Sequence, residues 1–169
     1  RDFCLSRGLG DVYKRQVRKS GIKFVMLFVG TPDDIGKLRS KIRECELEDY
    51  VQIIGKITDR DILSYFYVRA DLFLFPSTFD TSSLVQVEAA SQKTPTMFIE
   101  DSPTASAVTN GVNGFITKAN PKAYGRKIVE VLNDEALYKK VSENAYRDLY
   151  KTWDDAVEIL EGYYEEIVK

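Results

Sequence analysis

The stretch Asp71–Pro76 reads DLFLFP, and Ser77–Ala90 continues it as STFDTSSLVQVEAA. An apolar run followed by small hydroxyl residues and then by a helical pattern is typical of a buried strand that turns into a helix. The first amides of a helix lack intrahelical partners and lie at the positive end of its dipole. The stretch therefore predicts a helix whose start is either capped by Thr81 or Ser82 or holds an anion such as a phosphate.

The flanking sequence repeats this alternation of apolar runs and amphipathic segments. Strands are expected at 23–29, 50–54, 71–76, 96–99 and 114–117, and helices at 33–45, from 58–61 onward, at 83–92, 120–132, 135–150 and 154–168. Strands that alternate with helices favour an α/β fold, a Rossmann-like, doubly wound parallel sheet with helices on both faces.

Three local patterns add detail to this fold. The apolar run Lys23–Val29 is expected to be a strand covered on both faces. The pairs Asn110–Gly111 and Asn113–Gly114 are turn signals. In the last helix, an apolar stripe is expected to be a packing face; its residues are Val157, Leu160, Tyr163 or Tyr164, and Ile167.

Composition excludes several classes of function. The chain has 169 residues, enough for one sizeable domain, with 44% hydrophobic residues, 30% charged residues and a net charge of -2. This balance gives no sign of a nucleic-acid partner. Because the chain has no histidine, Ser-His and Cys-His nucleophiles are excluded, and a conventional zinc site is not expected. Two cysteines, Cys4 and Cys45, form no disulfide framework and indicate a reducing compartment.

The first residues differ in character from the rest. Residues 1–16 contain the string GLGDVYKRQ, show no helical or strand period and lack the apolar core of a signal peptide. The string resembles translated adapter read-through, so we expect residues 1–16 to be an artefact, with a disordered arm as the alternative. The domain is then 17–169. No apolar run in it approaches the roughly 20 residues that a membrane span needs.

In an open parallel sheet, ligands bind beyond the carboxyl ends of the strands. The loops Gly30–Pro32, Gly55–Ile57 and Ser77–Ser83 are expected at that edge. Glu88 follows Leu84 by one helical turn, and a helix side chain leans toward the N-terminus of its helix. Its carboxylate would suit a sugar diol beside a bound phosphate. The alternative is that Glu88 is a solvated surface charge behind a capped helix start.

Two acidic patterns invite a metal-binding interpretation. Asp59-Arg60-Asp61 is a D-x-D, a pattern that binds divalent metals in some sugar transferases. Thr58 with Asp61 is also a helix-start capping arrangement, which we favour. Asp154 and Asp155 are expected to start the last helix rather than to bind a metal.

The residues around the opening stretch resemble the C-terminal domain of GT-B glycosyltransferases of the retaining family 4. The family pattern is P-S-x-x-E, seven residues, E-A, then G-x-P and a D-G-x-N-G-like turn. The matching residues are Ala70–Ser77, Asp80, Leu84, Glu88–Ala89, Pro95 and Asn110–Ile116. Weaker likeness at Phe28–Gly30, Ile54–Gly55 and the helix at Trp153 extends the resemblance over about residues 22–168. The spacing across 76–116 is specific, and it favours the ligand interpretation over simple capping.

The resemblance implies a role for each matched residue. Asp80 would contact hydroxyls of the donor sugar and is the expected catalytic residue. Ser83 and Leu84 would offer backbone amides to the diphosphate, and Glu88 would bind the ribose hydroxyls. A looser match puts Gly30 on the donor-side glycine loop. Lys56 and Ile57 match the segment that lines the base, equally loosely.

Several positions depart from the family pattern. Asp80 is one methylene shorter than the usual glutamate, and Ser83 and Lys93 replace glycines. The D-T-S-S-L form is similar to a bacterial subgroup near the diacylglycerol glucosyltransferases. The family's phosphate-binding Arg and Lys fall near Lys14 and Arg15, within residues 1–16, so that role is not transferred. The N-terminal acceptor domain of a GT-B enzyme has no counterpart in these 169 residues.

The resemblance implies the donor-binding half of a retaining hexosyltransferase of cell-envelope polysaccharide or glycolipid synthesis. Its donor would be a nucleotide-diphosphate sugar, with UDP-sugar favoured. The resemblance implies no cofactor, no metal and no nucleic-acid partner. The acceptor would be a lipid or a polysaccharide, and the half alone would transfer nothing. The implied location is the cytoplasm, or the inner face of the membrane through the complete protein. The alternative function is a non-catalytic nucleotide- or nucleotide-sugar-binding module.

Overall fold

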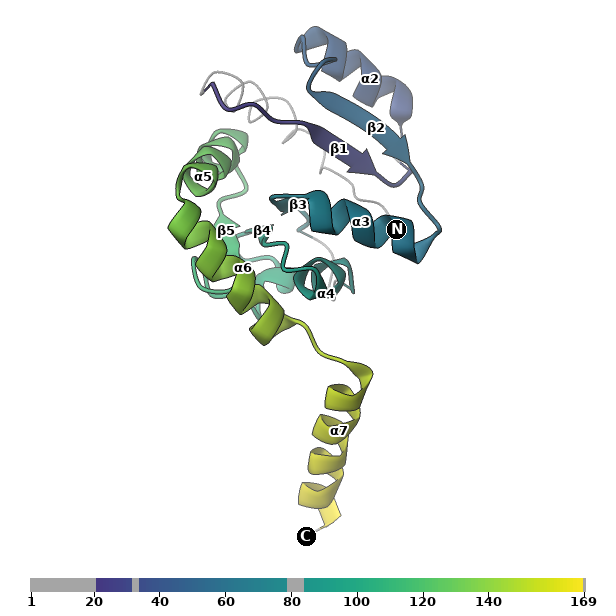
Figure 1. Ribbon diagram of the computed structural model, residues 1–169, viewed down its shortest axis with the longest axis vertical. Helices are drawn as coiled ribbons and strands as arrows, with labels where there is room; N and C mark the ends of the chain where they lie inside the picture. The colour runs from purple at the N-terminus through teal and green to yellow at the C-terminus, as the bar shows by residue number, and fades with distance from the viewer. Residues whose placement is uncertain (1–20, 32–33, 79–83, 169) are drawn as a thin grey trace.

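The structure is a computed structural model, which describes residues 21–31, 34–78 and 84–168. In chain order its elements are β1 (Met26–Val29), α2 (Ile35–Glu44), β2 (Val51–Gly55), α3 (Arg60–Arg69), β3 (Phe73–Phe75), α4 (Leu84–Ser91), β4 (Thr96–Ile99), the 3-10 turn η1 (Pro103–Ala105), β5 (Phe115–Thr117), α5 (Pro121–Asn133), α6 (Glu135–Leu149) and α7 (Trp153–Val168). This alternation confirms the α/β class with parallel strands (Figure 1).

The strands form two hydrogen-bonded groups. β1 pairs with β2, and β3, β4 and β5 pair in that order, all in parallel. The expectation of one continuous sheet is therefore wrong in this detail, since no ladder joins the two groups within the described residues. They meet through side chains instead, because Ile22, Phe24 and Met26 pack against the core cluster of the second group.

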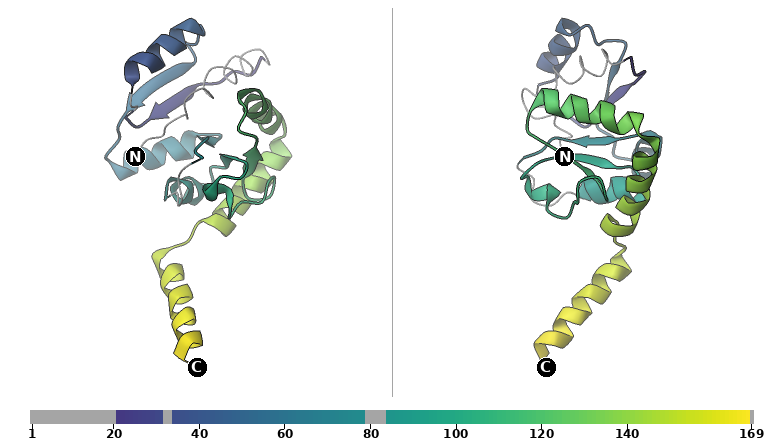
Figure 2. Two further views of the ribbon diagram at one scale, coloured as in Figure 1. Left: turned by 180° about the vertical axis from the view of Figure 1, so that it is seen from behind. Right: turned by 90° about the vertical axis from the view of Figure 1, so that its left-hand side faces the viewer.

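The second sheet is covered by helices on both faces. In β4, Met97 and Ile99 belong to a core cluster with residues of α5 and α6. Phe98, between them in sequence, belongs to another cluster with Tyr67 of α3 and Ala89 of α4. Successive strand residues point to opposite faces, so the two clusters lie on opposite sides of β4. Figure 2 shows the sheet between these layers. All four residues of β4 are buried, in agreement with the predicted helices on both faces of the sheet.

The first sheet has one apolar face in contact with solvent. Its covered side forms a cluster with Ile42, Cys45 and Leu47 of α2 and the segment after it. Leu27 on β1 is 42% exposed, and Val25, the residue before the strand, is 62% exposed. The prediction that this strand is covered on both faces is therefore wrong. The apolar run shows only that the side chains are hydrophobic. Whether one or both faces of the strand are covered depends on which other segments of the chain pack against it.

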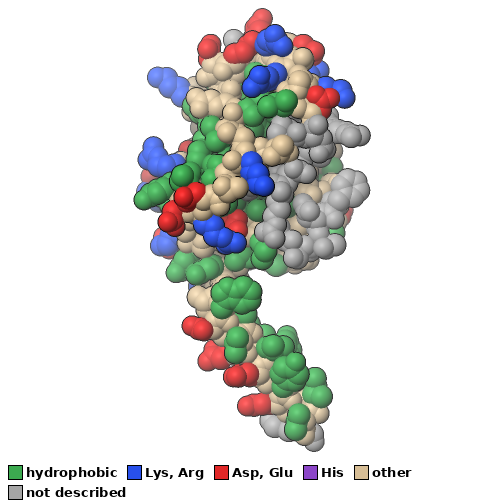
Figure 3. Space-filling model, turned by 90° about the vertical axis from the view of Figure 1, so that its right-hand side faces the viewer, with side chains coloured by type: hydrophobic (Ala, Val, Ile, Leu, Met, Phe, Trp, Pro, Cys, Tyr) green, Lys and Arg blue, Asp and Glu red, His purple; other side chains and the backbone are tan. Residues whose placement is uncertain are grey.

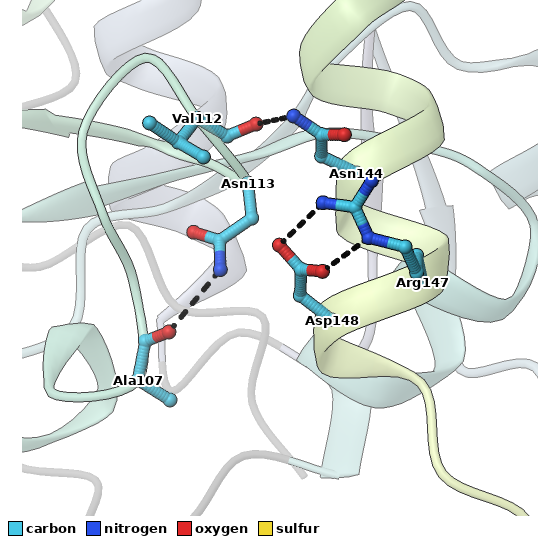
Figure 4. Close-up of polar contacts among 6 residues, drawn as sticks. All are labelled: Ala107, Val112, Asn113, Asn144, Arg147 and Asp148. Carbon is cyan, nitrogen blue, oxygen red and sulfur yellow. Dashed lines mark hydrogen bonds and ion pairs between the residues drawn. The ribbon is translucent and has the colours of Figure 1, made fainter.

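The loop between β4 and β5 confirms the two turn signals. Gly111 has a φ of 72°, and a Cβ added to Gly114 would lie 2.7 Å from Val108 Cγ1. Asn144 on α6 donates to the carbonyl of Val112 at 2.9 Å, and Figure 4 shows this bond and the neighbouring Arg147–Asp148 pair on the same helix. The loop is therefore fastened to α6 rather than loosely attached.

Helix α7 extends away from the rest of the molecule (Figures 1 and 2). None of its residues is buried, and Leu160 and Ile167 are 51% and 78% exposed. Figure 3 shows hydrophobic side chains along this helix next to acidic ones. The predicted packing of its apolar stripe is therefore wrong within this structure, because the pattern identifies an apolar face but not a surface that covers it. Among the described residues, no helix combines the length and apolarity that crossing a bilayer requires.

Candidate functional site

Helix α4 follows the carboxyl end of β3, the position at which parallel sheets bind ligands. Its first described residue is Leu84, which is 55% exposed, and the expected first residue, Ser83, lies outside the described residues. Asp80 and Ser83 lie outside the described residues, as do Thr81 and Ser82. The first four amides of a helix have no intrahelical acceptor. The start of α4 thus carries amide donors and the positive end of a dipole at the expected edge.

Glu88 is half-buried on α4, one turn after Leu84. Its Oε2 accepts a hydrogen bond from the hydroxyl of Tyr67 on α3, at 3.4 Å. The structure thus shows that Glu88 is not a freely solvated charge, which was the alternative interpretation. A carboxylate has about four acceptor positions on its two oxygens. One bond from Tyr67 therefore leaves it able to accept from two further hydroxyl groups.

The buried partner of Glu88 is a phenol that keeps its proton. Tyr67 is 5% exposed. Burial raises its pKa well above the ordinary range, and the negative charge and hydrogen bond of Glu88 raise it further. Tyr67 is therefore protonated at neutral pH and acts as the donor to Glu88.

The looser site residues follow two neighbouring strands, Gly30 after β1 and Lys56 and Ile57 after β2. The amide of Gly30 donates to the carbonyl of Gly55 at 2.8 Å, so the loops after the two strands start side by side. Lys56 is exposed and Ile57 is half-buried. These three residues follow strands of the first sheet, whereas Leu84 and Glu88 follow β3, a strand of the second sheet. The sequence-predicted site thus divides into two groups, one at the end of each sheet.

The D-x-D segment forms a helix cap, but through a different residue from the one expected. Asp59 is the N-cap of α3, and its Oδ1 accepts from the amides of Asp61 at 2.9 Å and Ile62 at 3.1 Å. The prediction of Thr58 as the capping residue is wrong, because the aspartate that follows occupies the capping position. In the described ranges, no group of three or more His, Cys, Asp or Glu side chains could hold a metal ion.

The other acidic pair starts α7 as expected. The amide of Thr152 donates to Asp155 Oδ2 at 2.8 Å, and the Thr152 hydroxyl accepts from the Asp155 amide at 3.1 Å. The two residues therefore form reciprocal caps.

Lys93 replaces a glycine of the family pattern, and its backbone conformation shows why glycine is usual there. It has a φ of 58°, in the left-handed region that favours glycine. Its ammonium forms an ion pair with Glu143 at 2.8 Å, and its carbonyl accepts from the Ser142 hydroxyl. The family's glycine at this position thus matches a backbone requirement, and the contacts to α6 hold the lysine in its place.

Sequence reasoning missed Tyr67 as a neighbour of the site. It lies 21 residues before Glu88 on another helix, and no spacing rule connects the two positions. A tyrosine among the apolar residues of a helix is also the usual appearance of a core residue. Only the packing of α3 against α4 brings the two side chains together.

Comparisons with known proteins identify the fold and the family. The model of the family described as glycosyl transferases group 1 matches residues 9–148. HepE from Anabaena, solved in complex with UDP, superposes with a TM-score of 0.79 at 20% identity, over 99% of this chain and 47% of that one. The C-terminal domain of the group 1 protein LpcC from Francisella tularensis superposes with a TM-score of 0.63 at 16% identity, over 80% of this chain and 89% of that one.

A curated relative agrees with the family match. The poly(glycerol-phosphate) alpha-glucosyltransferase of Bacillus subtilis (strain 168) is 29% identical over 120 residues, which are 70% of this chain and 17% of that protein. The chain thus spans less than half the length of both HepE and this enzyme. The family match begins at residue 9, inside the segment 1–16, whose origin stays a prediction. The chain belongs to the glycosyl transferases group 1 family, and its fold is that of the C-terminal half of GT-B glycosyltransferases.

Proposed function

We propose that residues 17–169 are the donor-binding half of a retaining hexosyltransferase that uses a nucleotide-diphosphate sugar, with UDP-sugar favoured. The observation that carries the proposal is the half-buried carboxylate of Glu88, one turn into the helix that follows β3. The structure of HepE with UDP and the glucosyltransferase relative support the choice of nucleotide and of hexose.

In this proposal, α4 divides the donor between its amides and its carboxylate. Glu88 accepts hydrogen bonds from the two ribose hydroxyls, and Leu84 and Ser83 present backbone amides to the diphosphate. Negative charge grows on the diphosphate as the bond to the sugar breaks. Preorganised amides and a helix dipole stabilise such charge more strongly in the transition state than in the substrate.

The remaining roles complete the donor site. Asp80 contacts the sugar hydroxyls and is the proposed catalytic residue, with a shorter reach than the usual glutamate. Gly30 allows the donor to approach the end of β1, and Lys56 and Ile57 line the base. These assignments rest on the family resemblance. The proposed site includes no cofactor and no resident metal.

The acceptor is proposed to be a lipid or a polysaccharide bound by the N-terminal half of the complete protein. The B. subtilis relative is named as a poly(glycerol-phosphate) alpha-glucosyltransferase, which supports a polymer as the acceptor. The D-T-S-S-L form supports a glycolipid of the diacylglycerol type. We propose that the complete protein lies in the cytoplasm or at the inner face of the membrane, as the family resemblance implies.

Isothermal titration with UDP tests the donor site. Glu88→Ala is expected to weaken UDP binding at least about tenfold, since hydrogen bonds to a charged group contribute about 1.5–3 kcal/mol each. Glu161→Ala, which removes an exposed carboxylate from α7, is the matched control and should leave the affinity unchanged. Equal affinity of wild type and Glu88→Ala would reject the ribose assignment.

Sugar transfer separates the enzyme from a non-catalytic binding module, because both predict UDP binding. The protein that includes the N-terminal half is expected to hydrolyse or transfer the hexose of its donor, and Asp80→Ala should remove this activity. Residues 17–169 alone should show none. Strong hexose transfer by residues 17–169 alone would contradict the proposal. So would the absence of both hydrolysis and transfer by the longer protein when it is supplied with donor and with lipid and polysaccharide acceptors.

A further inference from the structure

We propose that Tyr67 is a positioning residue of the donor site, whose hydroxyl orients the Glu88 carboxylate to accept the ribose hydroxyls. This inference rests on the proposed function, since it assigns the ribose to Glu88. Tyr67 itself would not touch the donor. It would act only through Glu88, across the contact between α3 and α4.

The first observation is the direction of the contact. The Tyr67 hydroxyl lies 3.4 Å from Glu88 Oε2, and the phenol keeps its proton because its pKa is raised by burial and by Glu88. A carboxylate that accepts one fixed hydrogen bond cannot rotate freely about its terminal torsion, which is otherwise broad. The bond at Oε2 thus restricts which oxygen lone pairs face the start of α4.

The second observation is that Tyr67 is itself held rigidly. Its ring packs edge to face on Phe73, with centroids 5.5 Å apart. Its carbonyl accepts from the Thr94 hydroxyl at 2.6 Å and from the Ala70 amide at 3.0 Å. Tyr67 is therefore held at its ring by the core and at its backbone by Thr94, two residues before β4.

The third observation is that, among the described residues, the Glu88 carboxylate accepts a hydrogen bond from Tyr67 alone. Ser91 donates to the backbone carbonyl of Glu88 at 2.7 Å and so does not use the carboxylate. The 3.4 Å bond from Tyr67 is long for an O–H···O contact, whose usual distance is about 2.7–2.8 Å. It orients the carboxylate without saturating it, and the remaining acceptor positions can receive two ribose hydroxyls.

The test compares two ligands on each variant. Dissociation constants of UDP and 2′-deoxy-UDP are measured for wild type, Tyr67→Phe, Glu88→Ala and Tyr124→Phe. Wild type should prefer UDP, and Tyr67→Phe should reduce this preference on the order of fivefold, the effect of one hydrogen bond of about 1 kcal/mol. Glu88→Ala should nearly abolish the preference.

Tyr124→Phe is the matched control. Tyr124 is also buried, and its hydroxyl donates to the carbonyl of Met97 at 2.8 Å. The change also removes a buried tyrosine hydroxyl, but from the other core cluster, on the α5 side of the sheet, so the preference for UDP should stay at the wild-type value. Partial unfolding of a variant lowers the apparent affinity for both ligands by the same factor. The ratio of the two dissociation constants therefore still reports on the ribose contact.

The double variant Tyr67→Phe/Glu88→Ala tests whether Tyr67 acts through Glu88. If Tyr67 acts through Glu88, Tyr67→Phe should not change UDP affinity further in the Glu88→Ala background. A wild-type preference in Tyr67→Phe, or a full additional loss in the double variant, overturns the positioning role and leaves the proposed function standing. Failure of wild type to bind UDP, or to distinguish it from 2′-deoxy-UDP, overturns the ribose assignment and the positioning role with it.

Discussion

The amide of Gly30 donates to the carbonyl of Gly55 at 2.8 Å, and both glycines have positive φ angles, 126° and 85°. The bond closes the ladder between β1 and β2, just after the register shifts between Phe28 and Val29. Such an irregularity at a strand end re-aims the chain that follows it. The Gly30–Gly55 bond therefore sets the direction of both loops that are proposed to contact the donor.

Replacing either glycine by alanine is expected to strain the backbone. Gly30→Ala should lower the free energy of unfolding by about 1–3 kcal/mol, because its φ is sparsely populated by other residues. Gly55→Ala should cost about 1–2 kcal/mol from strain alone, since an added Cβ meets nothing within 4 Å. Urea denaturation measures both. Gly162→Ala, which also adds a Cβ into open space but within helix α7, should cost nothing. A Gly30→Ala protein as stable as wild type would contradict the conformational argument.

Lys93 offers a test in the opposite direction. Its left-handed φ of 58° costs an ordinary residue about 1–2 kcal/mol. Its exposed ion pair with Glu143 contributes at most about 1 kcal/mol. Lys93→Ala loses the pair and keeps the strain, whereas Lys93→Gly loses the pair and relieves the strain. We expect the glycine variant to be about 1 kcal/mol more stable than the alanine variant in urea unfolding. The reverse order would show that Lys93 is not strained in solution.

The N-cap of α3 distinguishes a structural from a metal-binding role of the D-x-D. Asp59→Ala should lower stability by about 1 kcal/mol, whereas Asp59→Asn should lower it little, because asparagine caps helices as well as aspartate. A metal ligand would behave differently, since asparagine has no negative charge. Thermal melts with and without Mg²⁺ check this. A melting temperature of wild type that rises with Mg²⁺, and no longer rises in Asp59→Asn, would reinstate the metal interpretation.

The fold was predictable where one short segment contains the whole signal. Thr96–Ile99 is a strand with the predicted bounds, because four buried residues between turn signals leave little choice. The start of α5 was predictable because Asn120 caps it, accepting from the amides of Lys122 and Ala123. Polar capping groups and apolar runs act on their immediate neighbours, and the sequence displays both.

The candidate site was only partly predictable, because its geometry depends on distant residues. Glu88 was found from its spacing in the family pattern, but its partner Tyr67 was not, since the contact joins two helices. The cover of β1 and of α7 was predicted wrongly for a related reason. Leu27 of β1 and Ile167 of α7 are apolar and exposed, and hydrophobicity alone does not determine which surface, if any, will cover them. The contributions of Asp80 and Ser83 lie outside the described residues.

Helix α7 is expected to contribute little to the stability of the rest of the chain. None of its residues is buried, so deletion after Lys151 should shift the melting temperature by less than about 2 °C, although far-UV helix signal is lost. Leu47→Ala is the positive control, because Leu47 is fully buried and its truncation should cost about 2–5 kcal/mol. The deletion should also raise solubility, since it removes exposed apolar side chains such as Trp153. A drop of the melting temperature comparable to that of Leu47→Ala would mean that the apolar stripe of α7 packs against the domain in solution.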